Sequence, residues 1–129
     1  GVTCMNHQLS IVENAQRCIN EVRSVAGVVS CALVSSEGTV LGRHFREDEQ
    51  SSPLFAVMCA TVLASADAAC GSVHVRRPSS VTVAAADATI FIVSAGEAAL
   101  IAAVIHKSAD LPTVQRRLSE LAVRFGEVA

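Results

Sequence analysis

The chain has 129 residues, about half of them hydrophobic, few aromatic, and a formal net charge of −2. This length suits one domain with a core of its own, so we expect residues 1–129 to form a single domain. The charge gives no overall basic field for nucleic acid, and the absence of Trp and Tyr removes the stacking surface that single-stranded nucleic acid needs.

The first third of the chain predicts a helix followed by a β-hairpin. Apolar residues recur at three- and four-residue steps from about Asn6 to Ala26, with charged residues between them, as in an amphipathic helix. Gly27 ends this pattern. Two β-rich segments, 28–35 and 39–45, then flank a short Ser-Glu-Gly turn, which is typical of a hairpin.

A strongly apolar helix is predicted next, between Ser51 and Gly71. Ser51 or Ser52 can cap it, and Pro53 suits its first turn. Asp67 is the one charge after the cap, although a surface helix normally shows a polar face. The apolar segment is short for a membrane span and rich in alanine, so we expect a soluble helix and no membrane insertion.

Projected on a helical wheel, this helix separates large from small side chains. The large residues are Phe55, Met58, Cys59, Val62, Leu63 and Cys70. The adjoining arc holds Ala56, Ala60, Ala64, Asp67 and Ala68. We expect the large residues to pack on the sheet and the alanine row to receive the same helix of a second copy, because small residues allow helix backbones to approach closely. An exposed apolar strip of this length is unusual for a monomer.

The remaining sequence predicts three strands and a final helix. The strands 80–86, 88–95 and 98–106 are separated by tight turns, and the last is apolar on both faces, which suits the centre of a sheet. Capping residues and Pro112 open the helix that follows. The order α-β-β-α-β-β-β-α predicts an α+β fold with a five-stranded antiparallel sheet flanked by helices.

This order and three segments resemble the roadblock family, named for a dynein light chain and including bacterial and archaeal regulators of Ras-like GTPases. The resemblance spans about Leu9 to Phe125. It is carried by INEVRSVAGVVSCALVSSEGTVLG, by the alanine-rich helix, and most strongly by VTVAAADATIFIVSAGEAALIAAVIHKSADLPTVQRRLSEL. It implies a profilin-like fold and a non-catalytic homodimer or heterodimer in which equivalent helices pack together and two sheets join edge to edge.

The resemblance also implies that strand 80–86 is the sheet edge used for pairing. Its residues Val81, Thr82 and Val83 are β-branched and the strand is uncharged, so an unprotected edge of this kind invites another strand. Together with the alanine row, these three residues form the predicted dimer interface.

No catalytic, cofactor or metal site is predicted. Motifs of phosphate-binding loops, nucleophile elbows and dinucleotide-binding turns are absent, and the four histidines are scattered over separate elements. Five cysteines without a C-x-x-C pair favour free thiols in a reducing cytoplasm. Arg76 and Arg77 are candidate partner contacts through charge-assisted hydrogen bonds, although a solvated pair is the simpler interpretation.

Three functions remain open. The favoured hypothesis is a cytoplasmic, non-enzymatic dimer that regulates or scaffolds a Ras-like GTPase. The alternatives are a structural subunit of a larger motor or membrane-docked assembly, and a sensor that holds a small molecule between sheet and helix.

Overall fold

The computed structural model describes residues 2–46 and 52–128, with side chains described from residue 12 onward. Eight elements follow one another: α1 (Val2–Arg23), β1 (Val28–Ser35), β2 (Val40–His44), α2 (Ser52–Ser72), β3 (Ser80–Ala84), β4 (Ala88–Ser94), β5 (Ala99–His106) and α3 (Leu111–Val128). The expected order is confirmed, and the strands end within two residues of their expected limits.

The first helix differs most from expectation. It begins at Val2 rather than near Asn6 and ends at Arg23 rather than Ala26. Its end is set by Ser24, whose hydroxyl donates to the Glu21 carbonyl (2.6 Å) and satisfies an acceptor that the helix would otherwise use.

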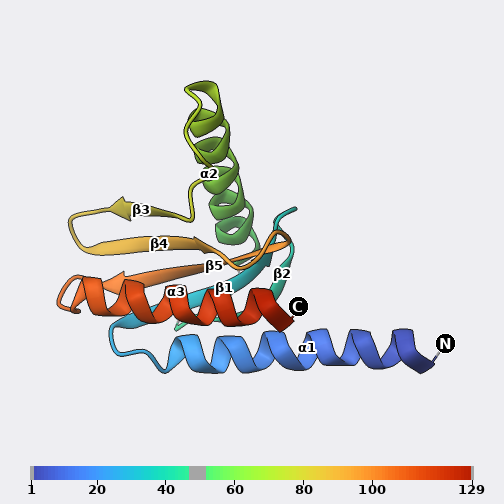
Figure 1. The fold of residues 1–129 in the computed structure, drawn as a ribbon. Helices are drawn as coiled ribbons and strands as arrows, with labels where there is room; N and C mark the ends of the chain where they lie inside the picture. Colours follow the sequence, from blue (N-terminus) through green and yellow to red (C-terminus); the bar gives the residue numbers. More distant parts are fainter. Residues whose placement is uncertain (1, 47–51, 129) are drawn as a thin grey trace.

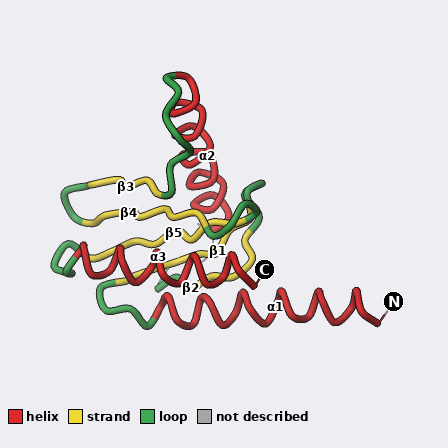
Figure 2. Tube along the Cα trace, in the orientation of Figure 1, coloured by secondary structure: helices red, strands yellow, loops and turns green. Residues whose placement is uncertain are grey.

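All five strands are antiparallel, in the spatial order β2-β1-β5-β4-β3 (Figures 1 and 2). The central position predicted for β5 is confirmed, and its residues are apolar on both sides because both faces of the strand are covered. The edge position predicted for β3 is also confirmed. Tight hairpins join β1 to β2 and β4 to β5; the Gly38 amide donates to Ser35 and the Ala95 amide to Ala99.

Helices α1 and α3 lie side by side on one face of the sheet (Figure 1). Their apolar stripes and the facing side chains of β1, β4 and β5 make the larger core. Its largest fully buried members are Ile19, Leu33, Ile101, Ile105 and Leu118. The apolar stripe of α3, formed by Val114, Leu118, Leu121 and Phe125, is buried in this core.

The second core lies between α2 and the opposite face of the sheet, and small side chains dominate it. Its buried members are Ala32, Val34, Ala56, Cys59, Ile92, Leu100 and Ala102. Three of these seven are alanines, so the helix backbone lies close to the sheet along a narrow strip.

Glycine permits two close approaches that position the helices. A Cβ at Gly42 on β2 would lie 2.9 Å from Ile19 Cγ1, so α1 rests directly on this strand. Gly27 has a φ of 99°, and a Cβ there would meet the Cβ of Ala109 in the loop before α3.

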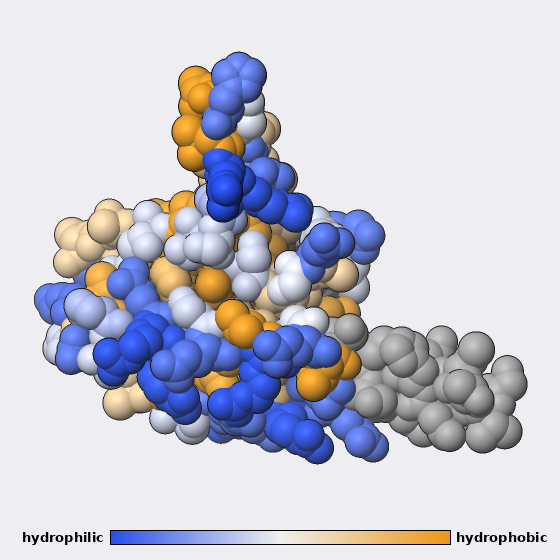
Figure 3. Space-filling model, in the orientation of Figure 1, coloured by the Kyte–Doolittle hydropathy of each residue, from blue (hydrophilic) through white to orange (hydrophobic). Residues whose placement is uncertain are grey.

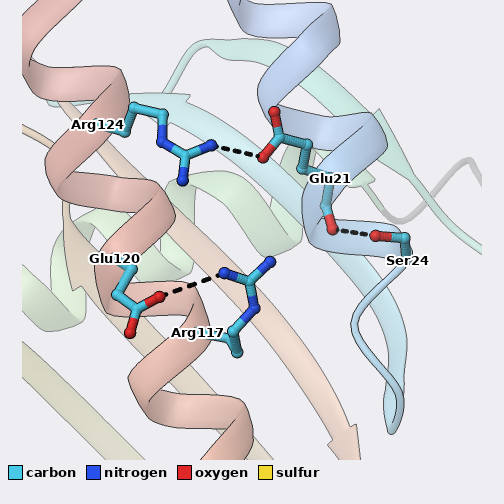
Figure 4. Close-up of polar contacts among 5 residues, drawn as sticks. All are labelled: Glu21, Ser24, Arg117, Glu120 and Arg124. Carbon is cyan, nitrogen blue, oxygen red and sulfur yellow. Dashed lines mark hydrogen bonds and ion pairs between the residues drawn. The ribbon is translucent and has the colours of Figure 1, made fainter.

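Polar contacts across the α1–α3 layer are few and exposed (Figure 4). Arg124 on α3 donates to Glu21 on α1 (3.0 Å), and Arg117 pairs with Glu120 within α3 (3.2 Å). Exposed ion pairs of this kind contribute about 0–1 kcal/mol each, so apolar burial holds this layer together.

Candidate interaction surface

Helix α2 crosses the strands and projects beyond the β3 edge of the sheet (Figure 1). It lies against β1, β2, β3 and β5, yet its fully buried residues, Ser52, Ala56 and Cys59, all fall in its first eight positions. The rest of the helix is therefore only partly supported by the chain's own sheet.

The outward face of α2 is apolar. Leu54 is 65% exposed and Met58 50%, and Val57 and Val62 lie exposed beside them. Figure 3 shows hydrophobic atoms on the projecting part of the helix. By length and composition α2 is apolar enough to cross a membrane, and only 17% of its most apolar window is buried. Exposed apolar surfaces of this kind are characteristic of interaction sites.

The predicted division of α2 into a sheet face and a partner face is wrong in part. Ala56 is fully buried on the sheet, so it is not available to a partner, whereas Met58 and Val62, expected inside, are exposed. Ala60 packs partly against the same core, and Ala64 and Ala68 are exposed. The reason lies in the sheet, whose alanines at this crossing leave room for a close approach that only small helix residues allow.

Both ends of α2 are fixed by polar contacts. Arg43 of β2 donates from Nη1 to Ser52 Oγ (3.1 Å), which ties the helix start to the sheet. At the other end the Val75 amide donates to Cys70 and the His74 amide to Gly71, with His74 at a φ of 61°. This is the Schellman arrangement that reverses the chain after a helix. Arg43 was not identified from the sequence, where it reads as a solvated strand residue.

The two candidate arginines differ in their surroundings. Arg77 Nε lies 3.4 Å from Asp67 Oδ2, so the segment after α2 is paired back to the helix, whereas Arg76 is exposed with no ion pair among the described residues. Asp67 and Arg77 line a hollow between α2 and the β4–β5 hairpin, which also receives Ala60 and Glu97. Its volume is about 110 Å³.

The β3 edge presents unpaired backbone groups. β3 pairs only with β4 among the described strands, and the Ser94 amide donates to the Ser79 carbonyl while Ala85 donates to Ala88. In an antiparallel ladder, bonded and non-bonded pairs alternate, so Val81 and Val83 bond to β4 while Ser80, Thr82 and Ala84 direct their N–H and C=O groups outward. The Thr82 hydroxyl accepts a bond from Gln115 Nε2 of α3 (3.2 Å).

The described residues contain no group of three or more His, Cys, Asp or Glu side chains arranged to hold a metal ion. Cys18, Cys31, Cys59 and Cys70 are free. Burial raises the pKa of Cys18 to about 11, with a smaller contribution from Glu21, and burial likewise raises the pKa of Cys31 to about 12. Protonated, buried thiols behave as small hydrophobic residues rather than nucleophiles.

Comparison with solved structures supports the same architecture. An MglB with a tetrameric arrangement superposes with a TM-score of 0.83 at 20% identity, covering 93% of this chain and 90% of that one. The gliding protein MglB of Thermus thermophilus gives 0.83 at 19% identity, covering 93% and 91%. Profilin II of Acanthamoeba castellanii gives 0.60 at 16% identity, covering 87% and 96%, so the fold is profilin-like as expected.

A comparison with curated proteins gives no significant match. The Roadblock/LC7 domain family, in contrast, matches residues 15–105, which run from the buried part of α1 to the end of the central strand. The match includes the projecting helix and the open edge strand described above. By sequence family as well as by fold, this chain belongs to the Roadblock/LC7 domain family.

Proposed function

We propose that this chain is a cytoplasmic, non-enzymatic homodimer, with residues 1–129 as a single domain, that binds a Ras-like small GTPase. The observation that carries the proposal is the apolar face of α2 projecting past an open sheet edge. The two features lie next to each other, so one partner can cover both.

A second copy of the chain fits this pair of features. If its β3 strand pairs with β3 of the first copy, the outward N–H and C=O groups of both strands are satisfied. The partner's sheet then continues below the projecting half of α2, and the two α2 helices come together. One symmetric contact thus covers the open edge and the exposed Leu54, Val57, Met58 and Val62.

A protein contact suits α2 better than insertion into a membrane. The helix carries Asp67 paired to Arg77 and packs Ala56 and Cys59 on the sheet, so only one side of it is free. Insertion would require stripping this packed side from the sheet and moving a charged pair into hydrocarbon.

The dimer is tested by placing a charge on the exposed face. Met58→Arg should convert the dimer to a monomer, because an unpaired buried charge costs several kcal/mol, which is on the order of the stability of a modest dimer. Val123→Arg is the matched control, since Val123 is 60% exposed on α3, on the opposite side of the sheet. Light scattering distinguishes the states. A wild-type monomer at tens of micromolar, roughly the range of a weak dimer, contradicts the proposal.

The proposed GTPase role draws on the family and on the site. The chain belongs to the Roadblock/LC7 domain family, and the resemblance to roadblock proteins implies a regulator of a Ras-like GTPase. The chain offers a broad rigid surface rather than a reaction centre. Any effect on GTP hydrolysis is then indirect, through ordering of the switch segments of the GTPase. An arginine supplied in trans is the alternative, and Arg76 is the better placed because Arg77 is already paired with Asp67.

The test uses the Ras-like small GTPases of the organism that makes this protein, each loaded with GDP or a GTP analogue, and measures binding and GTP turnover. Nucleotide-dependent binding to the dimer, with turnover changed less than about tenfold by Arg76→Ala, supports indirect regulation. A loss of stimulation of about a thousandfold identifies an arginine finger instead. Absence of binding in either nucleotide state contradicts the GTPase assignment while leaving the dimer intact.

A small-molecule sensor is less favoured by the geometry. The hollow between α2 and the sheet measures about 110 Å³, whereas pockets for drug-sized ligands span about 300–1,000 Å³. A structural subunit of a larger assembly would use the same dimer. It would differ from a GTPase regulator because it would leave the GTP turnover of a bound GTPase unchanged.

A further inference from the structure

We propose that the end of the sheet where β5 passes into α3 binds a phosphate group. This site, called here the His106 end, consists of residues 23–28, 44–46, 85–88 and 106–117. The site is separate from α2 and from the β3 edge, so a test of phosphate binding does not depend on the proposed dimer or GTPase partner.

The topology gathers positive charge at this end. α1 finishes here, β2 and β5 finish here, the β3–β4 turn lies here, and α3 begins here. The cations in these segments are Arg23, Arg46, Lys107, Arg116 and Arg117. The carboxylates in the same segments are Asp87 and Asp110, and the histidines are His44 and His106. Arg117 is already paired with Glu120 (3.2 Å), whereas the other four cations have no ion pair among the described residues, so within these segments unpaired cations outnumber the two carboxylates.

Four polar side chains from three parts of the chain line one hollow. His44 ends β2 and Arg46 follows it, whereas His106 ends β5 and Ser108 lies in the turn before α3. Backbone of residues 27–29 completes the lining, the volume is about 510 Å³, and no carboxylate of the described residues lines it. A metal ion is disfavoured by this composition, whereas an anion finds donors and positive charge together.

The neighbouring hollow extends the same surface. It shares Gly27 and Ser108 with the first, has a volume of about 470 Å³ and contains Arg117. Its carboxylate, Asp110, already accepts a hydrogen bond from the Thr113 hydroxyl (2.8 Å). Arg117 is paired with Glu120 (3.2 Å), so the first turn of α3, the positive end of an 18-residue helix, is the main source of positive potential in this hollow.

The ring of His106 is held in one orientation. The Ser108 amide donates to His106 Nδ1 (3.0 Å), so this nitrogen is an acceptor, and the Ser108 hydroxyl lies 2.7 Å from the same atom. The proton of the neutral ring is therefore on Nε2, which has no partner among the described residues. His106 thus presents an N–H donor at a hollow that Arg46 also lines.

A phosphate group matches this arrangement because it is compact and carries several acceptor oxygens. The donors are single groups of different kinds that come from the end of β2, the following loop and the β5–α3 turn and line one hollow. Such a set suits one tetrahedral anion with oxygens in several directions.

The experiment follows the imidazole signals of His44, His106 and His74 by NMR during titration with inorganic phosphate, at constant pH and ionic strength with chloride as the balancing ion. Saturable shifts of His44 and His106, with His74 on the far linker unmoved, are expected. Arg46→Gln should weaken binding at least about tenfold, as the loss of a charge-assisted bond predicts, and Arg124→Gln, an exposed arginine on the far half of α3, should not. Small non-saturating shifts shared by all three histidines, or equal affinity of Arg46→Gln, overturn the proposal.

Two further arms distinguish the source of the phosphate group. O-phosphoserine tests a soluble phosphomonoester, and sedimentation with phosphatidic acid vesicles tests a lipid headgroup. If the protein binds one of these two probes and Arg46→Gln abolishes that binding, the result supports the site and identifies the source of the phosphate group. Binding in neither arm overturns the assignment to a phosphate group.

Discussion

The open edge of β3 allows a sharp test, because Thr82→Pro removes an outward backbone donor without breaking a bond to β4. Thr82 is the middle of the three residues whose N–H and C=O groups face away from the sheet. Proline lacks the N–H but fits an extended edge strand, so the fold should tolerate it. The side-chain bond lost within the described part of the chain is the exposed one from Gln115.

The expected magnitude follows from the symmetry of the proposed dimer. Each copy loses one interchain donor, and a net hydrogen bond is worth about 0.5–1.5 kcal/mol. Two lost bonds therefore cost about 1–3 kcal/mol, which weakens the dimer about 5- to 150-fold. The melting temperature of a monomeric background such as Met58→Arg should change little, because the β3–β4 ladder is intact.

Sedimentation equilibrium of wild type, Thr82→Pro and Thr82→Val measures the dissociation constant. Thr82→Val keeps the amide and loses only the hydroxyl, so it controls for the contact with Gln115. Val83→Pro removes a donor that faces β4, and should lower stability itself. If Thr82→Pro dimerises as tightly as wild type while Met58→Arg is monomeric, the edge-pairing argument is wrong and the contact is made by helices alone.

Three further predictions concern the fold. Gly42→Ala should lower the free energy of unfolding by about 1–3 kcal/mol in urea titrations, because its Cβ would lie 2.9 Å from Ile19 Cγ1; an unchanged midpoint means that α1 shifts freely. Leu118→Ala, at a fully buried site, should cost about 2–5 kcal/mol, and a loss below about 1 kcal/mol by the same measurement contradicts the packing of α3. Burial raises the pKa of Cys18 to about 11 and of Cys31 to about 12, above the ordinary 9.0, so the stabilisation from burying these neutral thiols is complete below pH 9 and is lost as pH rises toward 11–12. Cys31→Ala should therefore reduce the fall of the urea unfolding midpoint between pH 9 and pH 12. An equal fall in the variant would show that other groups cause it.

Local pattern was enough to predict the elements and much of their placement. Turn residues and caps act over a few positions, so the hairpins and the starts of α2 and α3 were readable from the chain itself. The apolar character of both faces of β5 predicted its central position, because only a strand covered on both sides carries such a sequence. The family resemblance supplied the edge position of β3.

Tertiary structure decided which side of α2 is buried and which groups remain free. Both arcs of this helix are apolar, so periodicity does not choose between them. The choice depends on the sheet face below the helix, where Ala32 and Ala102 leave room for Ala56 to approach closely. The pairing of Arg77 with Asp67 and the cationic end around His106 depend on segments far apart in sequence. The sequence alone determined whether each segment forms a helix or a strand, because capping, turn residues and apolar periodicity act over a few positions. The interaction surfaces were decided by the tertiary structure, because they are the parts of each element that no distant segment of the chain covers.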